Sequence, residues 1–231
     1  MINQAVLFCG GYGTRFNDKK KKILKPLAKV NGLPILRIII DIFFKQGISN
    51  FLLLGGYKFS DLKKFERKYS SKRLKIFALN TGIGSSTAER LLRAQNYLED
   101  NFFLTYGDSI ANFSVKKFKN YKTDYKFYVS TYEYNVPYGV FYSVKNSNII
   151  KKCYEKNFKV SINAGFYVLN KNIFKFIKSK NSVFEKDVLN KVAKAKNFKL
   201  VKNKLSFWMP MDYKQDISKI EKTLRKKKKI D

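Results

Sequence analysis

A short apolar run leads directly into a glycine-rich loop in the stretch Ala5-Val6-Leu7-Phe8-Cys9-Gly10-Gly11-Tyr12-Gly13-Thr14-Arg15. The four apolar residues Ala5–Phe8 predict a buried strand that ends at the glycine pair. Glycines at such a position let backbone N–H groups approach phosphate oxygens closely. Arg15 and Lys25 would add the positive charge that a bound triphosphate requires. The stretch therefore predicts a phosphate-binding loop at the carboxyl end of a buried strand.

Two common nucleotide-binding motifs do not fit this loop. A Walker loop would close with Gly-Lys-Ser or Gly-Lys-Thr, and this one does not. A dinucleotide-binding fingerprint would place a third glycine where Phe16 stands. For the glycines alone, an ordinary turn after a strand remains the simpler interpretation.

The chain around this loop alternates between strand and helix patterns. The predicted order is a helix after Pro34, a strand at Phe51–Leu54 ending at Gly55-Gly56, an amphipathic segment from Ser60, a strand at Leu74–Leu79, a helix near Ser86–Leu98 and a strand at Phe102–Tyr106. Such alternation favours an α/β fold with a mostly parallel central sheet flanked by helices. Ligands then gather at the carboxyl ends of the strands.

The second half is richer in strands. The runs Tyr125–Glu133, Val140–Val144 and Ser161–Leu169 contain many β-branched and aromatic residues, and helices are predicted at Asn172–Lys178, Glu185–Lys194 and Tyr213–Arg225. We expect one domain over residues 1–225, with a nucleotide-binding half at 1–112 and a small β-rich acceptor-binding half at 113–225. Residues 226–231 are predicted to form a basic, solvated tail.

Composition narrows the class of protein. With 231 residues and 45% hydrophobic content, the chain can bury a full core. The apolar stretch Pro34–Phe44 is interrupted by Arg37 and Asp41, so no membrane span is expected. The first residues lack an export signal, which predicts a cytoplasmic location. No histidine and only two cysteines, Cys9 and Cys153, argue against a zinc site or a histidine general base.

The formal net charge of +31 raises the question of nucleic-acid binding. The excess is mostly lysine and is spread along the chain, whereas surfaces that read bases favour local clusters of arginine. No specific nucleic-acid partner is therefore expected.

Several motifs in the same order resemble those of one enzyme family. The glycine-rich loop with Lys25-Pro26-Leu27 resembles the signature of the sugar-phosphate nucleotidyltransferases. Further motifs are similar to the glucose-1-phosphate cytidylyltransferase branch, namely Leu79-Asn80-Thr81-Gly82, Phe103-Leu104-Thr105-Tyr106-Gly107-Asp108, Ile162-Asn163-Ala164-Gly165-Phe166 and Phe207-Trp208-Met209-Pro210-Met211-Asp212. The resemblance covers nearly the whole chain and implies a Rossmann-like nucleotidyltransferase fold.

The resemblance also implies a reaction and its participants. A nucleoside monophosphate, most simply CMP from CTP, would pass to a sugar 1-phosphate such as glucose 1-phosphate, with Mg²⁺ as cofactor and pyrophosphate as the second product. Homo-oligomers are possible, although the apolar helix at residues 35–44 is better explained as core.

The resemblance assigns roles to particular residues. Arg15 and Lys25 would be catalytic, and Asp108 and Asp212 would hold the metal, which usually takes few protein carboxylates. Without the resemblance, each aspartate would read as a turn former or a helix N-cap. The remaining residues would bind the nucleotide (Phe8, Gly10, Gly11, Gly13, Thr14, Leu79, Gly82, Thr87 and Asp108) or the acceptor (Tyr138, Gly139, Glu155, Lys156, Asn163 and Glu185).

Two departures from the branch pattern bear on specificity. The chain has Ala88-Glu89 before Arg90 where the branch usually carries two glycines, and Ala164 where it commonly has glycine. These changes could narrow one wall of the nucleobase pocket or change its charge. A guanylyl- or uridylyltransferase for another hexose or heptose phosphate is the alternative within the class, and a non-catalytic nucleotide-binding protein is the alternative outside it.

Overall fold

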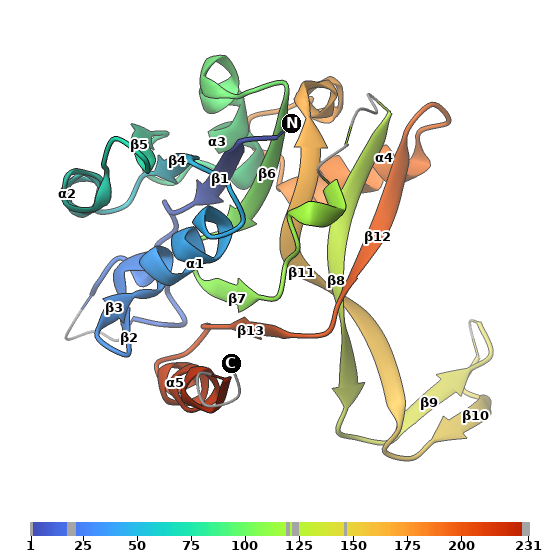
Figure 1. Ribbon diagram of the computed structural model, residues 1–231. Helices are drawn as coiled ribbons and strands as arrows, with labels where there is room; N and C mark the ends of the chain where they lie inside the picture. Colours follow the sequence, from blue (N-terminus) through green and yellow to red (C-terminus); the bar gives the residue numbers. More distant parts are fainter. Residues whose placement is uncertain (1, 18–21, 119–120, 122–124, 146, 228–231) are drawn as a thin grey trace.

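A seven-stranded sheet forms the centre of the protein. The computed structural model describes residues 2–17, 22–118, 121, 125–145 and 147–227. The strands lie in the order β12-β8-β11-β6-β1-β4-β5 (Figure 1). Their bounds are β1 Gln4–Phe8, β4 Asn50–Gly55, β5 Lys75–Asn80, β6 Asn101–Tyr106, β8 Lys126–Val136, β11 Phe158–Asn170 and β12 Lys199–Leu205. Only β11 runs antiparallel to its neighbours, β6 and β8, and the other pairings are parallel. The predicted mostly parallel sheet is confirmed.

Alternating side chains along the strands build two cores, one on each face of the sheet. In β1, Ala5 and Leu7 join one apolar cluster, whereas Val6 and Phe8 join the other. Helices α1 (Ile35–Phe44), α2 (Phe59–Tyr69) and α5 (Asp216–Lys227) contribute to the first cluster. The second is covered by α3 (Thr87–Ala94), the π-helical turn η5 (Phe184–Leu189) and α4 (Asn190–Lys194). Because strand side chains alternate in direction, a strand buried on both faces reads as a continuous apolar run.

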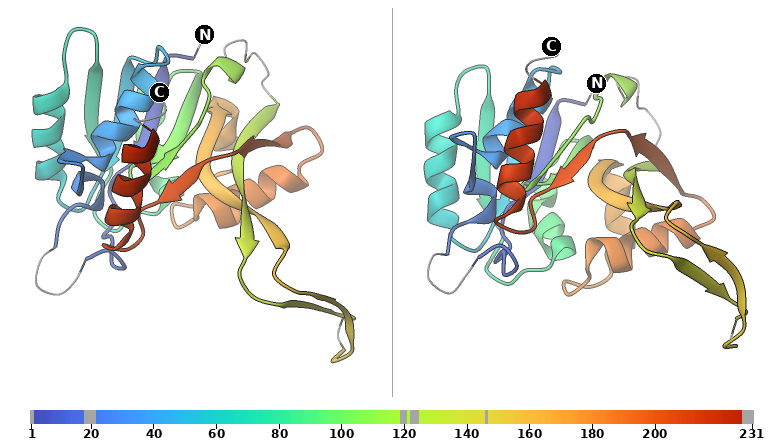
Figure 2. Two further views of the ribbon diagram at one scale, coloured as in Figure 1. Left: turned by 60° about the horizontal axis from the view of Figure 1, so that its bottom comes forward. Right: turned by 90° about the horizontal axis from the view of Figure 1, so that it is seen from below.

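Beyond the sheet, β8 and β11 continue as a two-stranded ribbon. The hairpin of β9 (Val140–Ser143) and β10 (Ile150–Tyr154) lies at its end. The described residues of this segment, 133–145 and 147–161, project from the body of the molecule (Figures 1 and 2). We call this segment the arm. Large apolar side chains on it, including those of Tyr138, Phe141 and Ile149, are exposed.

Two short ladders complete the fold. Strand β2 (Lys29–Val30) pairs with β3 (Leu33–Pro34), and β7 (Ser109–Ala111) pairs antiparallel with β13 (Trp208–Pro210). The 3-10 turns are η1 (Lys25–Leu27), η2 (Gln95–Tyr97), η3 (Lys116–Phe118) and η4 (Lys171–Phe176).

Several predicted elements need correction: the short strands β2, β3, β7 and β13 were not predicted, and the helix expected at Glu185–Lys194 begins as the π-helical turn η5. The helix expected near Asn172–Lys178 is the 3-10 turn η4, and the helix near Ser86–Leu98 becomes 3-10 after Ala94. Strands β10 and β12 were not predicted, because their lysine-rich sequences lack a clear apolar alternation. Residues 226 and 227 of the predicted basic tail lie in α5, and residues 228–231 lie outside the described residues.

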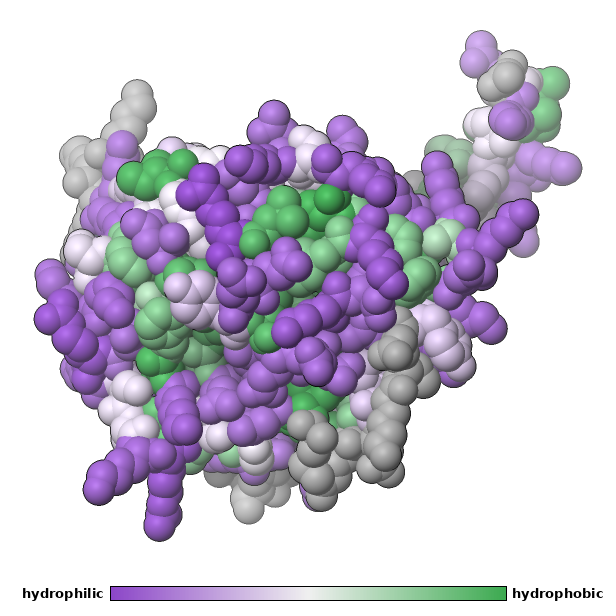
Figure 3. Space-filling view, turned by 90° about the horizontal axis from the view of Figure 1, so that it is seen from above, coloured by the Kyte–Doolittle hydropathy of each residue, from purple (hydrophilic) through white to green (hydrophobic). Residues whose placement is uncertain are grey.

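The described ranges contain no helix with the length and apolarity needed to cross a membrane. The face in Figure 3 is mostly hydrophilic, with small separate apolar areas between the polar side chains.

Candidate active site

A short strand pairing brings Asp108 and Asp212 together at the carboxyl edge of the sheet. Asp108 follows β6 and precedes β7, and Asp212 follows β13. The pairing of Ser109 with Pro210 places the two aspartates at the same end of this ladder. The Met211 N–H donates to the Asp108 carbonyl at 2.9 Å, which extends the ladder to the aspartates themselves.

Lys25 lies between the two carboxylates. Its Nζ is 2.7 Å from Asp108 Oδ2 and 3.2 Å from Asp212 Oδ1. Its side chain is only 12% exposed, because the turn η1 turns it toward the interior beside buried Pro26. On the solvent side, Arg15 Nη2 is 3.2 Å from Asp212 Oδ1. The four residues form an alternating series of charges, Arg15–Asp212–Lys25–Asp108, which we call the charged centre.

Asp212 does not cap the following helix. Helix α5 begins at Asp216, whose Oδ2 accepts from the backbone N–H groups of Asp212 and Tyr213 at 3.0 Å and 2.8 Å. Burial opposes ionisation of Asp216, but the Tyr213 N–H and Lys219 outweigh it, so the pKa of Asp216 is lowered. Asp216 therefore fixes the backbone of Asp212 and leaves the Asp212 carboxylate free for the charged centre.

The glycine-rich loop is shaped by Gly13 and Asn17. Gly13 has a φ of +61°, which favours glycine, and a Cβ there would lie 3.2 Å from the Lys25 Cβ. The Asn17 side chain donates to the carbonyls of Tyr12 and Ile23, which closes the loop against η1. Gly11 and Thr14 are exposed, and a Cβ on Gly11 would meet no atom within 4 Å. This part of the loop is open to an incoming ligand.

The other predicted nucleotide-binding residues lie around this loop. Gly10 and Gly82 both accept from the guanidinium of Arg90. Leu79 is half-buried at the end of β5, and the Thr87 hydroxyl accepts from the Phe184 N–H at 2.8 Å. The Phe8 side chain is a core residue, packed against Tyr106 and Phe184, so that Phe8 could reach a ligand only through its backbone.

At the start of α3, the charge of Glu89 is balanced by Arg93. Ala88 is fully buried, and Glu89 forms an ion pair with Arg93 at 2.8 Å. Hydrogen bonding from Arg93 lowers the pKa of Glu89. Arg93 also lies beside Gly82, where a Cβ would be 3.1 Å from its Nη1. The wall near Gly82 thus carries an ion pair and no unbalanced negative charge.

The predicted acceptor residues divide into two groups. In the first, Asn163 Nδ2 donates to the Tyr167 hydroxyl at 2.7 Å, and that hydroxyl donates to Glu185 Oε1 at 3.2 Å. The Tyr106 hydroxyl also donates to Glu185. Burial, followed by the charge of Glu185, raises the pKa of both Tyr106 and Tyr167, so both stay protonated donors. Asn163 and Glu185 therefore belong to one network at the bulge in β11.

The second group lies on the arm. A Cβ on Gly139 would be 3.3 Å from Glu155 Oε2, and Lys156 Nζ lies 3.8 Å from Glu155 Oε1. Tyr138 is 75% exposed, and the Lys156 side chain is 79% exposed with its backbone at a φ of +59°. Residues expected to bind one acceptor are thus distributed over two places in the fold.

The sequence analysis missed four residues that organise the site, namely Asn17, Arg90, Tyr106 and Tyr167. Arg90 and Tyr106 bond to residues far away in the sequence, which no local pattern indicates. Asn17 and Tyr167 also bond to residues within six positions, but their residue types gave no sign of these contacts. Tyr106 lies within one of the motifs that resemble the family, and Arg90 directly follows the departure at Ala88-Glu89.

The charged centre has suitable donors for one Mg²⁺. Two carboxylates converge on a single point, occupied here by Lys25 Nζ, and their side chains are 27% and 33% exposed. Mg²⁺ prefers oxygen ligands and usually keeps water and phosphate oxygens in its remaining positions. No group of three or more acidic, cysteine or histidine side chains suited to a metal occurs within the described ranges. A site with two protein carboxylates therefore fits, and a cage of protein ligands does not.

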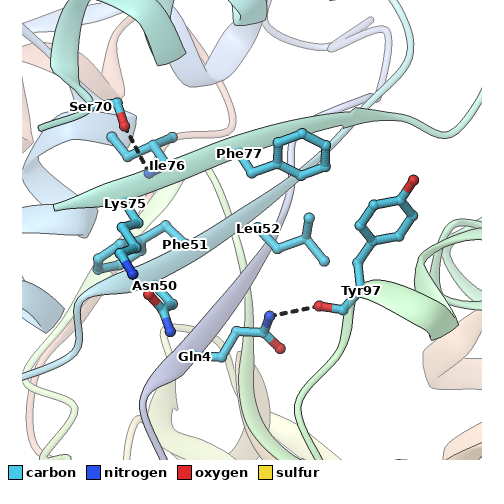
Figure 4. Close-up of a pocket in the computed structure, with 9 residues that line it drawn as sticks. All are labelled: Gln4, Asn50, Phe51, Leu52, Ser70, Lys75, Ile76, Phe77 and Tyr97. Carbon is cyan, nitrogen blue, oxygen red and sulfur yellow. Dashed lines mark hydrogen bonds between the residues drawn. The ribbon is translucent and has the colours of Figure 1, made fainter. Parts of the chain in front are cut away.

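A separate pocket of about 220 Å³ lies at the opposite edge of the sheet (Figure 4). Gln4, Asn50 and Lys75, at the amino ends of β1, β4 and β5, line it, and Gln4 donates to the Tyr97 carbonyl. It holds none of the predicted site residues.

The fold and site define an α/β protein with a glycine-rich loop beside a lysine–aspartate centre. The chain matches the model of the family described as nucleotidyl transferase over residues 4–227. It belongs to this family and is a sugar-phosphate nucleotidyltransferase.

Individual relatives differ in the nucleotide that their names give. The chain is 30% identical to a probable glucose-1-phosphate cytidylyltransferase of Bacillus subtilis, with 95% of each chain covered. It is 28% identical to a D-glycero-alpha-D-manno-heptose 1-phosphate guanylyltransferase of Campylobacter jejuni, covering 74% of this chain and 77% of that one. Among solved structures, HddC from Yersinia pseudotuberculosis complexed with GMP-PN shares the fold, with a TM-score of 0.72 and 23% identity, over 96% of this chain and 100% of that one.

Proposed function

We propose that this enzyme transfers CMP from CTP to a sugar 1-phosphate, such as glucose 1-phosphate, and releases pyrophosphate. The observation that carries the proposal is the charged centre beside the open glycine-rich loop. Coverage of 95% of the Bacillus subtilis cytidylyltransferase supports the choice of nucleotide and acceptor.

The acceptor phosphate can act as the nucleophile without a general base. A phosphate monoester has its second pKa near ~6, so it is largely a dianion at neutral pH. One of its oxygens attacks the α-phosphorus of the triphosphate, a new P–O bond forms, and the bond to the β-phosphate bridging oxygen breaks. The leaving pyrophosphate takes that electron pair. The absence of histidine from the chain is compatible with this reaction.

Lys25 and Arg15 supply positive charge at two points of the reaction. Lys25 is held at the end of the loop, where its ammonium would offset the charge on the α-phosphate as the bond changes occur. Arg15 is more exposed and extends from the loop, so it would hold the departing pyrophosphate. Both side chains would then exchange part of their contact with aspartate for contact with phosphate.

Asp108 and Asp212 would hold Mg²⁺ when the triphosphate binds. The bound ion would neutralise phosphate charge and help to align the two reacting groups. Competition between Lys25 and a cation for the same carboxylates would couple the position of Lys25 to metal binding.

Two groups of residues would hold the acceptor. Glu185 would accept hydrogen bonds from the sugar hydroxyls, and Asn163 would donate hydrogen bonds to them. The tyrosine hydroxyls bonded to these two side chains would fix their orientation. Lys156 would bind the acceptor phosphate from the arm, and Glu155, Tyr138 and Gly139 would contact other parts of the acceptor.

A guanylyl- or uridylyltransferase is the second candidate. The Campylobacter jejuni guanylyltransferase aligns over 74% of this chain, which favours it. The Glu89–Arg93 pair near Gly82 also departs from the cytidylyltransferase pattern at the predicted nucleobase wall.

The experiment is pyrophosphate release with magnesium, using CTP, UTP, GTP, ATP and dTTP against a panel of hexose and heptose 1-phosphates. Fastest release with CTP and glucose 1-phosphate is expected. Fastest release with GTP or UTP would replace the cytidylyl assignment by the second candidate. No release with any pair would contradict both.

A further inference from the structure

Arg90 forms a buried junction beneath three loops of the nucleotide side. Its side chain comes from α3, which is held in the core by Ala88, Leu91 and Ala94, and the residue is only 4% exposed. Its Nη1 donates to the Gly55 carbonyl at 2.7 Å, the Thr81 hydroxyl at 2.6 Å and the Gly82 carbonyl at 3.1 Å. Its Nη2 donates to the Gly10 carbonyl at 3.0 Å. One side chain thus joins the loops that follow β1, β4 and β5.

The position of the guanidinium also explains why residues 10 and 56 are glycines. A Cβ on Gly10 would lie 2.3 Å from Arg90 Nη1, and a Cβ on Gly56 would lie 2.7 Å from the same atom. Real Cβ atoms do not approach other atoms this closely, so a side chain at position 10 would have to displace the arginine. A side chain at position 56 would have to displace both the arginine and the Gly82 carbonyl oxygen, which would lie 2.4 Å from its Cβ. The glycines at 10 and 56 therefore provide the space that the guanidinium occupies.

The chemistry of this junction requires arginine. All four acceptors are neutral oxygens, and no carboxylate of the described residues forms an ion pair with Arg90. Burial lowers the pKa of Arg90, yet a guanidinium stays protonated in proteins. A buried charge without an anionic partner is costly, and a lysine would concentrate its donors on one atom. Nη1 reaches the acceptors at residues 55, 81 and 82, and Nη2 reaches Gly10, so a lysine with its single nitrogen would lose at least the bond to Gly10.

We infer that Arg90 is a positioning residue that sets the glycine-rich loop relative to the loops at Gly55 and Gly82, and so shapes the nucleoside triphosphate site. Gly10 and Gly82 are among the residues assigned to the nucleotide, so the inference rests on the proposed function. Arg90 itself is covered by these loops and acts through them. Its loss would weaken binding of the triphosphate and leave binding of the sugar 1-phosphate unchanged.

The test compares Arg90→Lys with the parent protein and with Arg37→Lys. Arg37 lies on α1, where it pairs with Asp41 away from the loops, which makes it a matched control. Equilibrium dialysis with magnesium gives the Kd for CTP, GTP and UTP, and pyrophosphate release gives KM for each substrate. For Arg90→Lys we expect Kd and KM of the triphosphate to rise roughly ten- to hundredfold, because charge-assisted bonds to the loops are lost. The KM of the sugar 1-phosphate should stay unchanged.

A purely structural role predicts a different pattern. Arg90→Lys would then lower the folded fraction and the apparent kcat, with both KM values and the triphosphate Kd like those of the parent. That result would overturn the inference, as would equal increases for both substrates. If the parent binds triphosphate but releases no pyrophosphate, the proposed function fails while the ratio of Kd values still tests Arg90.

Two further variants keep the inference testable if Arg90→Lys fails to fold. Arg90→Ala should recover triphosphate affinity with added guanidinium ion, and no recovery in a folded protein would contradict the inference. Thr81→Val keeps the arginine and removes one of its acceptors, so a smaller but equally selective rise in triphosphate Kd is expected. If neither Arg90 variant folds, Thr81→Val decides, and an unchanged Kd there rejects the inference.

Discussion

The charged centre and the arm carry residues assigned to the same reaction, yet they are built very differently. Lys25 is held by two carboxylates, and the aspartates are fixed by the β7–β13 ladder and by Asp216. On the arm, Glu155 and Lys156 are 76% and 79% exposed and 3.8 Å apart. The exposed pair is worth little to stability, whereas buried charges depend strongly on their partners. Substitutions at the centre should therefore affect chemistry, and substitutions on the arm should affect acceptor binding alone.

The largest effect is expected for Lys25→Ala. Removing a charge that acts on the transition state typically lowers kcat by about 10²–10³-fold. Steady-state pyrophosphate release measures it, with Lys29→Ala as control because Lys29 is nearby but exposed. A raised KM with unchanged kcat would show that Lys25 serves ground-state binding, which would break the contrast with the arm.

Asp108→Asn tests the carboxylate side of the centre. We expect turnover to fall about 10²-fold and the magnesium concentration for half-maximal rate to rise, because a neutral amide binds the ion poorly. A magnesium titration of the rate measures both, with EDTA abolishing activity in the parent. A rate within a few-fold of the parent would remove Asp108 from the metal site. Asp100→Asn is a suitable control, since Asp100 lies before β6 and pairs with exposed Lys171.

Lys156→Ala tests whether the arm contributes a specific contact to the acceptor. Loss of one charge-assisted contact should raise the KM of the sugar 1-phosphate about tenfold and leave kcat and the triphosphate KM nearly unchanged. Lys159→Ala, also exposed on the arm, is the matched control. Equal effects of the two variants would mean that the arm contributes general positive charge and no specific contact.

The smallest effect is expected for Asp216→Ala. Losing the bonds to two backbone N–H groups should lower the free energy of unfolding by about 1 kcal/mol. Because the folded-state pKa of Asp216 is lowered, this contribution is present above its ordinary pKa of 3.8 and disappears as the pH falls through the folded value. Urea unfolding of parent and variant at pH 6 and pH 3 should show a smaller difference at the lower pH. An equal difference at both pH values would point to packing.

Much of the first half could be predicted from local sequence because its signals are local. Apolar runs such as Ala5–Phe8 and Phe51–Leu54 end in glycine pairs, and they became β1 and β4 with their side chains divided between two cores. The glycine-rich loop, Arg15 and Lys25 lie within a short stretch, so their proximity followed from the sequence alone. Strands β10 and β12 were missed, because pairing with a neighbour holds them in place despite a weak pattern.

By itself, the sequence determined the alternation of strands and helices in the first half, the position of the glycine-rich loop and the family. Only the tertiary structure decided which distant groups meet. The convergence of Asp108 and Asp212 on Lys25 depends on the register of a three-residue ladder, and the role of Arg90 depends on carbonyls from three separate loops. Local propensity acts over a few residues, whereas these contacts are fixed by packing between segments far apart in the chain.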